Sequence, residues 1–84
     1  MKIKQYEGAI MKYNKRIRNV REDRDLTQQI IADLLHIGQR TYADYESGKT
    51  RLPIDSLLFL AKYYDLSVDY LSGASDIPNP YPLE

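Results

Sequence analysis

A break of only three residues, His36 to Gly38, separates two stretches with the periodicity of short helices, and it constrains the fold more than any other feature of this sequence. Apolar residues share one face of a helix predicted over residues 28–35, and tyrosines share one face of a second helix predicted over residues 39–47. Gly38 suits the connection because glycine tolerates a positive φ and can also precede a helix. The two short helices therefore meet at a tight corner.

Three further helices are expected around this corner. Ile17 and Val20 lie on one face of an earlier helix that runs to about residue 24. Pro53 opens a later helix with the strongest helical pattern in the chain, formed by Ile54, Leu57, Leu58, Ala61 and Tyr64. A last short helix follows Ser67. Because strand patterns are nearly absent, the predicted fold class is all-α, a compact bundle of about five short helices.

Capping residues mark several of these helix ends. Thr27 and Ser67 precede predicted helices, and their hydroxyls can accept hydrogen bonds from the free N–H groups of the first turn. Gly48 is a natural C-terminal stop because it can adopt a left-handed conformation. The local sequence thus predicts where the helices begin and end.

The chain divides into three segments. Residues 14–73 carry the helical patterns and form one domain, since 84 residues suffice for one small core. Residues 1–13 are an N-terminal extension. Residues 74–84 contain three prolines within five residues, which exclude a helix, so we expect an extended tail there.

Composition excludes several classes of site. The sequence has no cysteine and one histidine, His36, which argues against structural zinc, iron–sulfur clusters and disulfides. It shows no set of nucleophile and base and no phosphate-cradling loop, so we expect neither an enzyme nor a cofactor. No apolar run is long enough for a membrane span or a signal peptide, and a soluble, cytoplasmic protein is expected.

The charges are unevenly distributed although the net charge is zero. Residues 1–24 hold eight Lys or Arg and three acids, a local charge of +5, whereas residues 25–51 carry −1 and residues 52–84 carry −4. A basic face opposite an acidic back suits a nucleic-acid partner. The alternative is that these charges only solvate the surface.

Tyrosine occurs eight times. Exposed aromatic rings can stack on nucleic-acid bases. However, Tyr42, Tyr45, Tyr64 and Tyr70 lie at core-facing helical spacing, so we predict that they pack in the interior.

Several sequence stretches resemble one family of DNA-binding proteins. They are Leu-Thr-Gln-Gln-Ile-Ile-Ala-Asp-Leu-Leu at 26–35, Ile-Gly-Gln-Arg-Thr at 37–41, Tyr-Glu-Ser-Gly-Lys at 45–49 and Leu-Ser-Val-Asp-Tyr-Leu at 66–71. They resemble the xenobiotic-response-element or phage-repressor family (Cro-type, lambda-repressor-like), whose members are helix-turn-helix proteins of bacteria and phages. The likeness runs from about Ile17 to Gly73.

The resemblance implies a set of DNA contacts. Gln39 matches a glutamine that reads adenine in the major groove, and Gln28 matches one that anchors to phosphate and packs on it. Arg40 faces the groove, where its planar fork suits guanine or a phosphate. Further groove or phosphate contacts are implied for Thr41, Ala43 and Asp44, and phosphate contacts for Lys49, Thr50 and Arg51.

Four positions call for separate comment. Arg21 and Glu46 match a family ion pair that joins the first helix to the recognition helix, and the resemblance leaves Arg21 partly free to touch phosphate. Asp44 departs from what DNA favours, because phosphates repel a carboxylate unless it accepts a hydrogen bond from cytosine. His36 stands where the family often has glycine, and no chemical role follows from it.

These features predict a sequence-specific regulator of transcription that binds double-stranded DNA and forms a homodimer. A repressor that occludes polymerase is expected, and activation by contact with polymerase is the alternative role. The alternative is an antitoxin-like or complex-forming protein whose helix-turn-helix serves autoregulation. In that case residues 1–13 or 74–84 bind another protein.

The N-terminal extension has a pattern of its own. Ile3, Tyr6, Ile10, Tyr13, Ile17 and Val20 alternate at spacings of three and four residues. Ile30 and Leu34 are apolar where the family usually carries solvated residues. We hypothesise that the extension is mostly helical and covers them, in its own chain or in a partner; the alternative is a frayed basic arm.

Overall fold

The computed structural model describes residues 12–78, and this part of the chain folds into five helices without a strand. The helices are α1 (Tyr13–Asp23), α2 (Gln28–Leu35), α3 (Gln39–Ser47), α4 (Ile54–Tyr64) and α5 (Val68–Leu71). The prediction of an all-α fold is confirmed. The proposed helix in the N-terminal extension concerns residues that lie almost entirely outside the described range.

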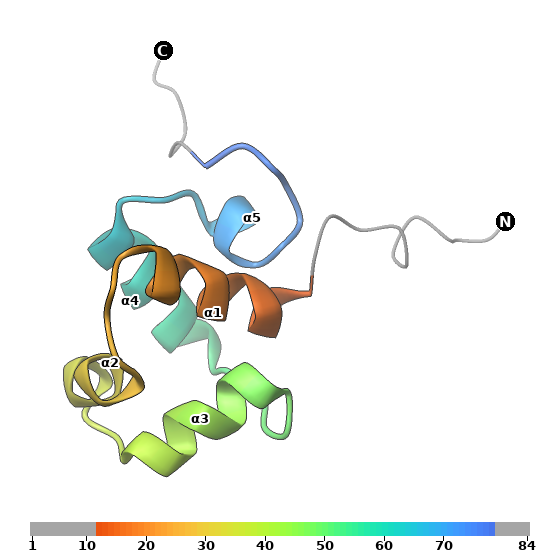
Figure 1. Ribbon diagram of the computed structural model, residues 1–84. Helices are drawn as coiled ribbons and strands as arrows, with labels where there is room; N and C mark the ends of the chain where they lie inside the picture. The colour runs from red at the N-terminus through yellow and green to blue at the C-terminus, as the bar shows by residue number, and fades with distance from the viewer. Residues whose placement is uncertain (1–11, 79–84) are drawn as a thin grey trace, which may run out of the picture.

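The two helices on either side of the tight corner pack against each other, and the rest of the fold supports them. α1 contacts both α3 and α5, and α4 contacts α5. In Figure 1, α2 and α3 form the lower part of the molecule and α5 lies at the opposite end. The recognition helix predicted from the sequence, α3, is therefore at one edge of the bundle.

The predicted caps are present. The Thr27 hydroxyl accepts a hydrogen bond from the Ile30 N–H at 3.1 Å, and the Ser67 hydroxyl accepts one from the Tyr70 N–H at 3.0 Å. In the corner, His36 adopts the left-handed conformation with φ of 60°, whereas Gly38 precedes α3 with φ of −76°. Of the two roles that the sequence left open for Gly38, the structure selects the start of a helix.

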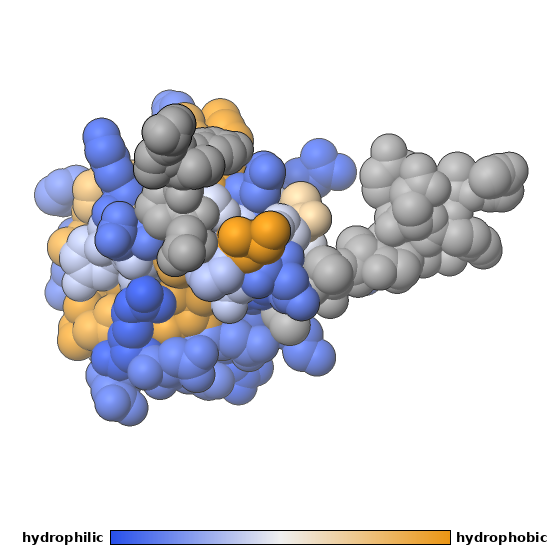
Figure 2. Space-filling view, turned by 90° about the horizontal axis from the view of Figure 1, so that it is seen from above, coloured by the Kyte–Doolittle hydropathy of each residue, from blue (hydrophilic) through white to orange (hydrophobic). Residues whose placement is uncertain are grey.

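The core lies where α1, α3, α4 and α5 meet the inner face of α2. It contains Ile17, Val20, Ile31, Ala32, Tyr42, Tyr45, Leu60, Ala61, Tyr64 and Leu71. Tyr42, Tyr45 and Tyr64 are buried as predicted, while Tyr70 is only half-buried. From above, hydrophobic residues also reach the surface among hydrophilic ones (Figure 2).

The apolar pattern of α4 located the helix but not its buried side. Ile54 and Leu58 are 62% and 48% exposed, whereas Leu60, which lay outside the pattern, is fully buried. The reason is that α4 is apolar on more than one face, so periodicity alone cannot choose the face that packs inward.

The segment after α5 lies against the domain over its described residues, 74–78. Residues 74–78 are not helical, as expected, but they fold back on the domain. The Arg16 guanidinium donates to the carbonyl oxygens of Tyr70 at 2.7 Å and Ser75 at 3.2 Å. The Ser67 N–H donates to the Pro78 carbonyl oxygen at 2.9 Å. A buried guanidinium needs acceptors, and Tyr70 of α5 and Ser75 of this segment supply them.

Residues 12–78 contain neither a membrane-spanning helix nor a metal-binding cluster. No helix there is long and apolar enough to cross a bilayer. In the same range, no three His, Cys, Asp or Glu side chains gather closely enough to hold a metal ion.

Candidate nucleic-acid interface

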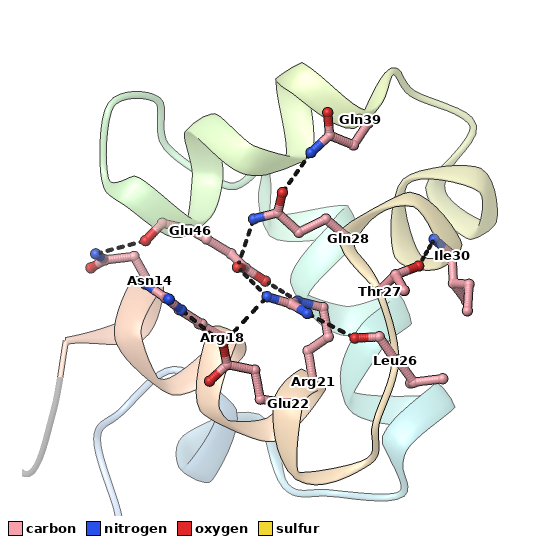
Figure 3. Close-up of polar contacts among 10 residues, drawn as sticks. All are labelled: Asn14, Arg18, Arg21, Glu22, Leu26, Thr27, Gln28, Ile30, Gln39 and Glu46. Carbon is pink, nitrogen blue, oxygen red and sulfur yellow. Dashed lines mark hydrogen bonds and ion pairs between the residues drawn. The ribbon is translucent and has the colours of Figure 1, made fainter.

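A buried ion pair links α1 to the end of α3. Arg21 Nε lies 2.7 Å from Glu46 Oε2 and Arg21 Nη2 lies 3.0 Å from Glu46 Oε1, so the two side chains pair through two parallel hydrogen bonds. Arg21 Nη1 also donates to the Leu26 carbonyl oxygen at 2.7 Å (Figure 3). This is the pair that the resemblance implied, and its fork geometry fixes both direction and distance between the helices.

The environment keeps Glu46 ionised. Burial by itself raises the pKa of this carboxyl group, but hydrogen bonds from Arg21 and Gln28 outweigh burial, and the pKa lies below its ordinary value. The hydrogen bond to Glu46 in turn raises the pKa of Arg21. Burial raises the pKa of the nearby Tyr42 hydroxyl, and Glu46 raises it further. The charged state of the pair is thus favoured at neutral pH.

A chain of side-chain contacts leads from this pair to the surface of α3. The Gln28 amide nitrogen donates to Glu46 Oε1 at 3.1 Å. The Gln39 amide nitrogen donates to Gln28 Oε1 at 2.6 Å (Figure 3). Gln39 is exposed and is the first residue of α3. The buried pair therefore orients the first side chain of the predicted recognition helix, through Gln28.

The outer face of α3 presents polar groups. Arg40 and Thr41 are exposed like Gln39, and Ala43 and Asp44 are half-buried. Arg40 Nε lies 3.8 Å from Asp44 Oδ1, one turn along the helix. This contact gives the Asp44 carboxylate a cation beside it, which reduces the repulsion that the sequence led us to expect between Asp44 and phosphates.

The loop after α3 is held at its backbone and leaves its side chains exposed. Gly48 has φ of 85°, a conformation that favours glycine. The N–H groups of Lys49 and Thr50 then donate to the Asp44 carbonyl oxygen at 2.9 and 3.2 Å. The side chains of Lys49, Thr50 and Arg51 are all exposed next to the end of α3. The loop thus presents two cations at a defined place.

Arg21 is largely enclosed by its partners. Only 8% of the residue is exposed, and all three guanidinium nitrogens are engaged, two with Glu46 and one with Leu26. These contacts use three of the five guanidinium N–H groups, so a contact between Arg21 and phosphate through the others stays a prediction. We assign Arg21 to the support of α3.

Asn14 is a supporting residue that sequence reasoning missed. Its amide nitrogen donates to the Glu46 carbonyl oxygen at 3.3 Å (Figure 3). A Cβ atom added at Gly48 would lie 3.3 Å from the same amide nitrogen. Asn14 thus packs against the end of α3, a position that no local pattern in α1 reveals.

Comparisons with known proteins agree with this arrangement. The sequence model of the helix-turn-helix family matches residues 17–71, and the chain belongs to this family. It is 38% identical over 68 residues to the HTH-type transcriptional regulator YobD of Bacillus subtilis, covering 81% of this chain and 61% of YobD. It is 31% identical over 64 residues to the phage CTXphi transcriptional repressor RstR of Vibrio cholerae, covering 76% of this chain and 58% of RstR.

A solved structure is also similar. The crystal structure of a transcriptional regulator from Listeria innocua superimposes with a TM-score of 0.71 at 33% sequence identity, covering 87% of this chain and 62% of that one. The chain thus spans about three fifths of the length of these relatives. The resemblance to helix-turn-helix repressors noted in the sequence is confirmed.

Proposed function

We propose that this chain regulates transcription by binding double-stranded DNA in a sequence-specific manner. The observation that carries the proposal is the chain of contacts from Arg21 through Glu46 and Gln28 to Gln39. It holds the first side chain of an exposed helix in a set orientation. An oriented glutamine amide offers the donor and the acceptor that match the adenine edge in the major groove.

In this proposal α3 enters the major groove. Gln39 reads adenine, Arg40 reads guanine or contacts a phosphate, and further contacts come from Thr41, Ala43 and Asp44. The amide nitrogen of Gln28 carries two N–H groups, so one can hold Glu46 while the other contacts phosphate.

Phosphate contacts set the register of the complex. Lys49, Thr50 and Arg51 follow α3 directly and are exposed. Lys15 and Arg18 are exposed on α1, and Arg18 Nε lies 3.1 Å from Glu22. The acidic remainder of the chain, from residue 52 on, carries −4 and is expected to lie away from DNA.

The regulatory role is the finer part of the proposal. The name of RstR describes a repressor, and binding over a promoter represses by excluding polymerase. We propose the same for this chain, acting as a homodimer in the cytoplasm of a bacterial host, on bacterial or phage DNA. A dimer reads two half-sites about one helical turn apart.

Selection from random duplex DNA tests the proposal. The parent protein should recover a two-fold related site, and Gln39→Ala should bind it about 1–3 kcal/mol more weakly and lose preference at one base position in each half-site. Gln29→Ala is the control, because the Gln29 amide contacts Asp33 on its own helix at 2.8 Å, so base preference should stay unchanged. Recovery of no site, together with a protein partner retained from native lysate, would favour the complex-forming alternative.

A further inference from the structure

Among the helices in the described part of the chain, α4 has the most exposed large apolar side chains, and they lie on its outward side. Ile54, Leu58, Phe59 and Tyr63 are 62%, 48%, 43% and 45% exposed. The rings of Phe59 and Tyr63 are stacked, with centroids 6.4 Å apart and planes at 8°. An apolar surface of this kind on a small domain indicates an interaction site.

Two opposite charges lie in the middle of this surface. At 3.6 residues per turn, the exposed residues Asp55 and Lys62 point away from the buried Leu60, Ala61 and Tyr64. Ile54 and Leu58 flank the charges on one side, and Phe59 and Tyr63 flank them on the other. We call these six residues, Ile54, Asp55, Leu58, Phe59, Lys62 and Tyr63, the α4 outer face.

The α4 outer face is complementary to itself. If two α4 helices pair antiparallel about a two-fold axis between positions 58 and 59, Asp55 of each copy meets Lys62 of the other. The same operation keeps each flank on its own side, so it brings Leu58 onto Leu58 of the other copy and Phe59 onto Phe59. The two central charges and the two central apolar residues thus each find a partner of matching chemistry. A parallel pairing sets Asp55 against Asp55 and is disfavoured by repulsion.

We infer that the α4 outer face binds a second copy of this chain, through an antiparallel pair of α4 helices. The inference identifies the surface of the homodimer that the proposed function invokes, and it does not depend on any DNA contact. The charge match at Asp55 and Lys62 favours a second copy over a foreign partner, because both halves of the match lie on one helix. An isologous interface of this kind needs a two-fold axis, and the axis between positions 58 and 59 supplies it.

The local shape fits this arrangement. Leu58 borders a hollow of about 400 Å³ that Lys62 and Val68 also line. The hollow lies on the Leu58 flank, at the level that Ile54 of the second copy reaches, and leaves room for that side chain. A single helix face is a small interface, and small interfaces are typical of weak, reversible association. The dimer therefore forms in a concentration-dependent manner in free solution.

A charge exchange tests the pairing on the full chain without DNA. Sedimentation velocity from low micromolar to the highest soluble concentration should show a monomer–dimer equilibrium for the parent. Asp55→Lys and Lys62→Asp should each raise the dimer dissociation constant at least about tenfold, because each sets like charges against each other twice per dimer. The double variant should recover most of the loss. Leu58→Asp should be monomeric throughout.

Thermal melts separate association from folding. Asp55 lies in the first turn of α4 and Lys62 in the last, so exchanging them opposes the helix dipole and lowers the melting temperature slightly. Recovery of the dimer in a slightly less stable double variant therefore points to the pairing itself.

Several outcomes would overturn the inference. A parent that stays monomeric, single exchanges that dimerise like the parent, or a double variant without recovery each contradict it. A monomeric parent that Leu58→Asp destabilises would show that the chain covers this face with its own segment. Loss of base preference in Gln39→Ala does not bear on these results, so the two proposals can fail separately.

Discussion

Two arginines of α1 are buried in different ways. Arg16 and Arg21 are 3% and 8% exposed, and both tie α1 to a distant part of the chain. Arg21 faces Glu46, whose side chain is 3% exposed, whereas the acid beside Arg16 is Asp76, which is 71% exposed. Arg16 also contacts the Tyr70 and Ser75 carbonyl oxygens and the Tyr70 ring, whose centroid is 3.9 Å from its guanidinium carbon.

This difference in environment indicates that Arg21 and Arg16 have different roles. The Arg21–Glu46 pair is a buried charge pair, so neither partner can be removed without leaving the other uncompensated. It also continues through Gln28 to Gln39 and so acts on the recognition helix. The hydrogen bonds of Arg16 to Tyr70 and Ser75 join α1 to α5 and to residues 74–78. We therefore expect Arg21 to support both stability and binding, and Arg16 to support stability alone.

The largest effect is expected for Glu46→Gln. The change leaves the Arg21 guanidinium buried without its anion, and the free energy of unfolding should fall by about 3 kcal/mol. DNA binding should weaken as well, even at temperatures where the variant is folded, because one of the two oxygens that accept from Arg21 and Gln28 becomes an NH2 group that cannot accept a hydrogen bond. Chemical denaturation and titration with the selected DNA site measure the two effects.

Glu22→Gln is the matched control. The Glu22 side chain is half exposed, and its contacts are with Arg18 at 3.1 Å and with Arg21 at 3.8 Å. Exposed ion pairs contribute little, so neither stability nor binding should change measurably. Equal denaturation midpoints for the two variants would contradict the distinction between the buried and the exposed acid.

A smaller effect is expected for Arg16→Met, which keeps the apolar stem and removes the donors. The Tyr70 and Ser75 carbonyl oxygens are close enough to the surface to turn partly to water, so we expect a loss of about 2 kcal/mol in the free energy of unfolding. Affinity for the DNA site should stay at the parent value in the folded variant. Asp76→Asn should change neither quantity, and a loss of affinity in Arg16→Met comparable to that in Glu46→Gln would show that the two regions are coupled.

The smallest effect is expected when the pH is lowered and the melting temperature is followed. Burial raises the pKa of Glu46, hydrogen bonds from Arg21 and Gln28 lower it more, and it lies below the ordinary value of 4.5. A lowered pKa in the folded state stabilises the fold above the ordinary pKa, and this contribution is lost as pH falls through the folded value. Melting temperatures from neutral pH down to about pH 3 should therefore fall less steeply for Glu46→Gln than for the parent. Parallel profiles would show that another carboxyl group controls the acid response.

The local features of the corner could be predicted from the sequence because their signals lie within a turn or two of the chain. Thr27, Gly48 and Ser67 act through backbone groups one to four residues away, so the predicted bounds of α2 and α3 agree with the structure. The resemblance added the pairing of Arg21 with Glu46 and of Gln28 with Gln39, which no spacing along one helix could supply.

Other features depend on contacts between distant segments, and only the tertiary structure decided them. In the sequence, nothing distinguishes Arg16 from the other basic residues of an amphipathic helix. Its burial depends on contacts with Tyr70 and Ser75, which lie more than fifty residues away along the chain. The buried side of α4 depends on which apolar stripe faces the core, and α4 has apolar residues on both sides. Periodicity shows which sides of a helix are apolar enough to be buried. The neighbouring helices determine which of these sides is buried, because burial is a property of the assembled bundle.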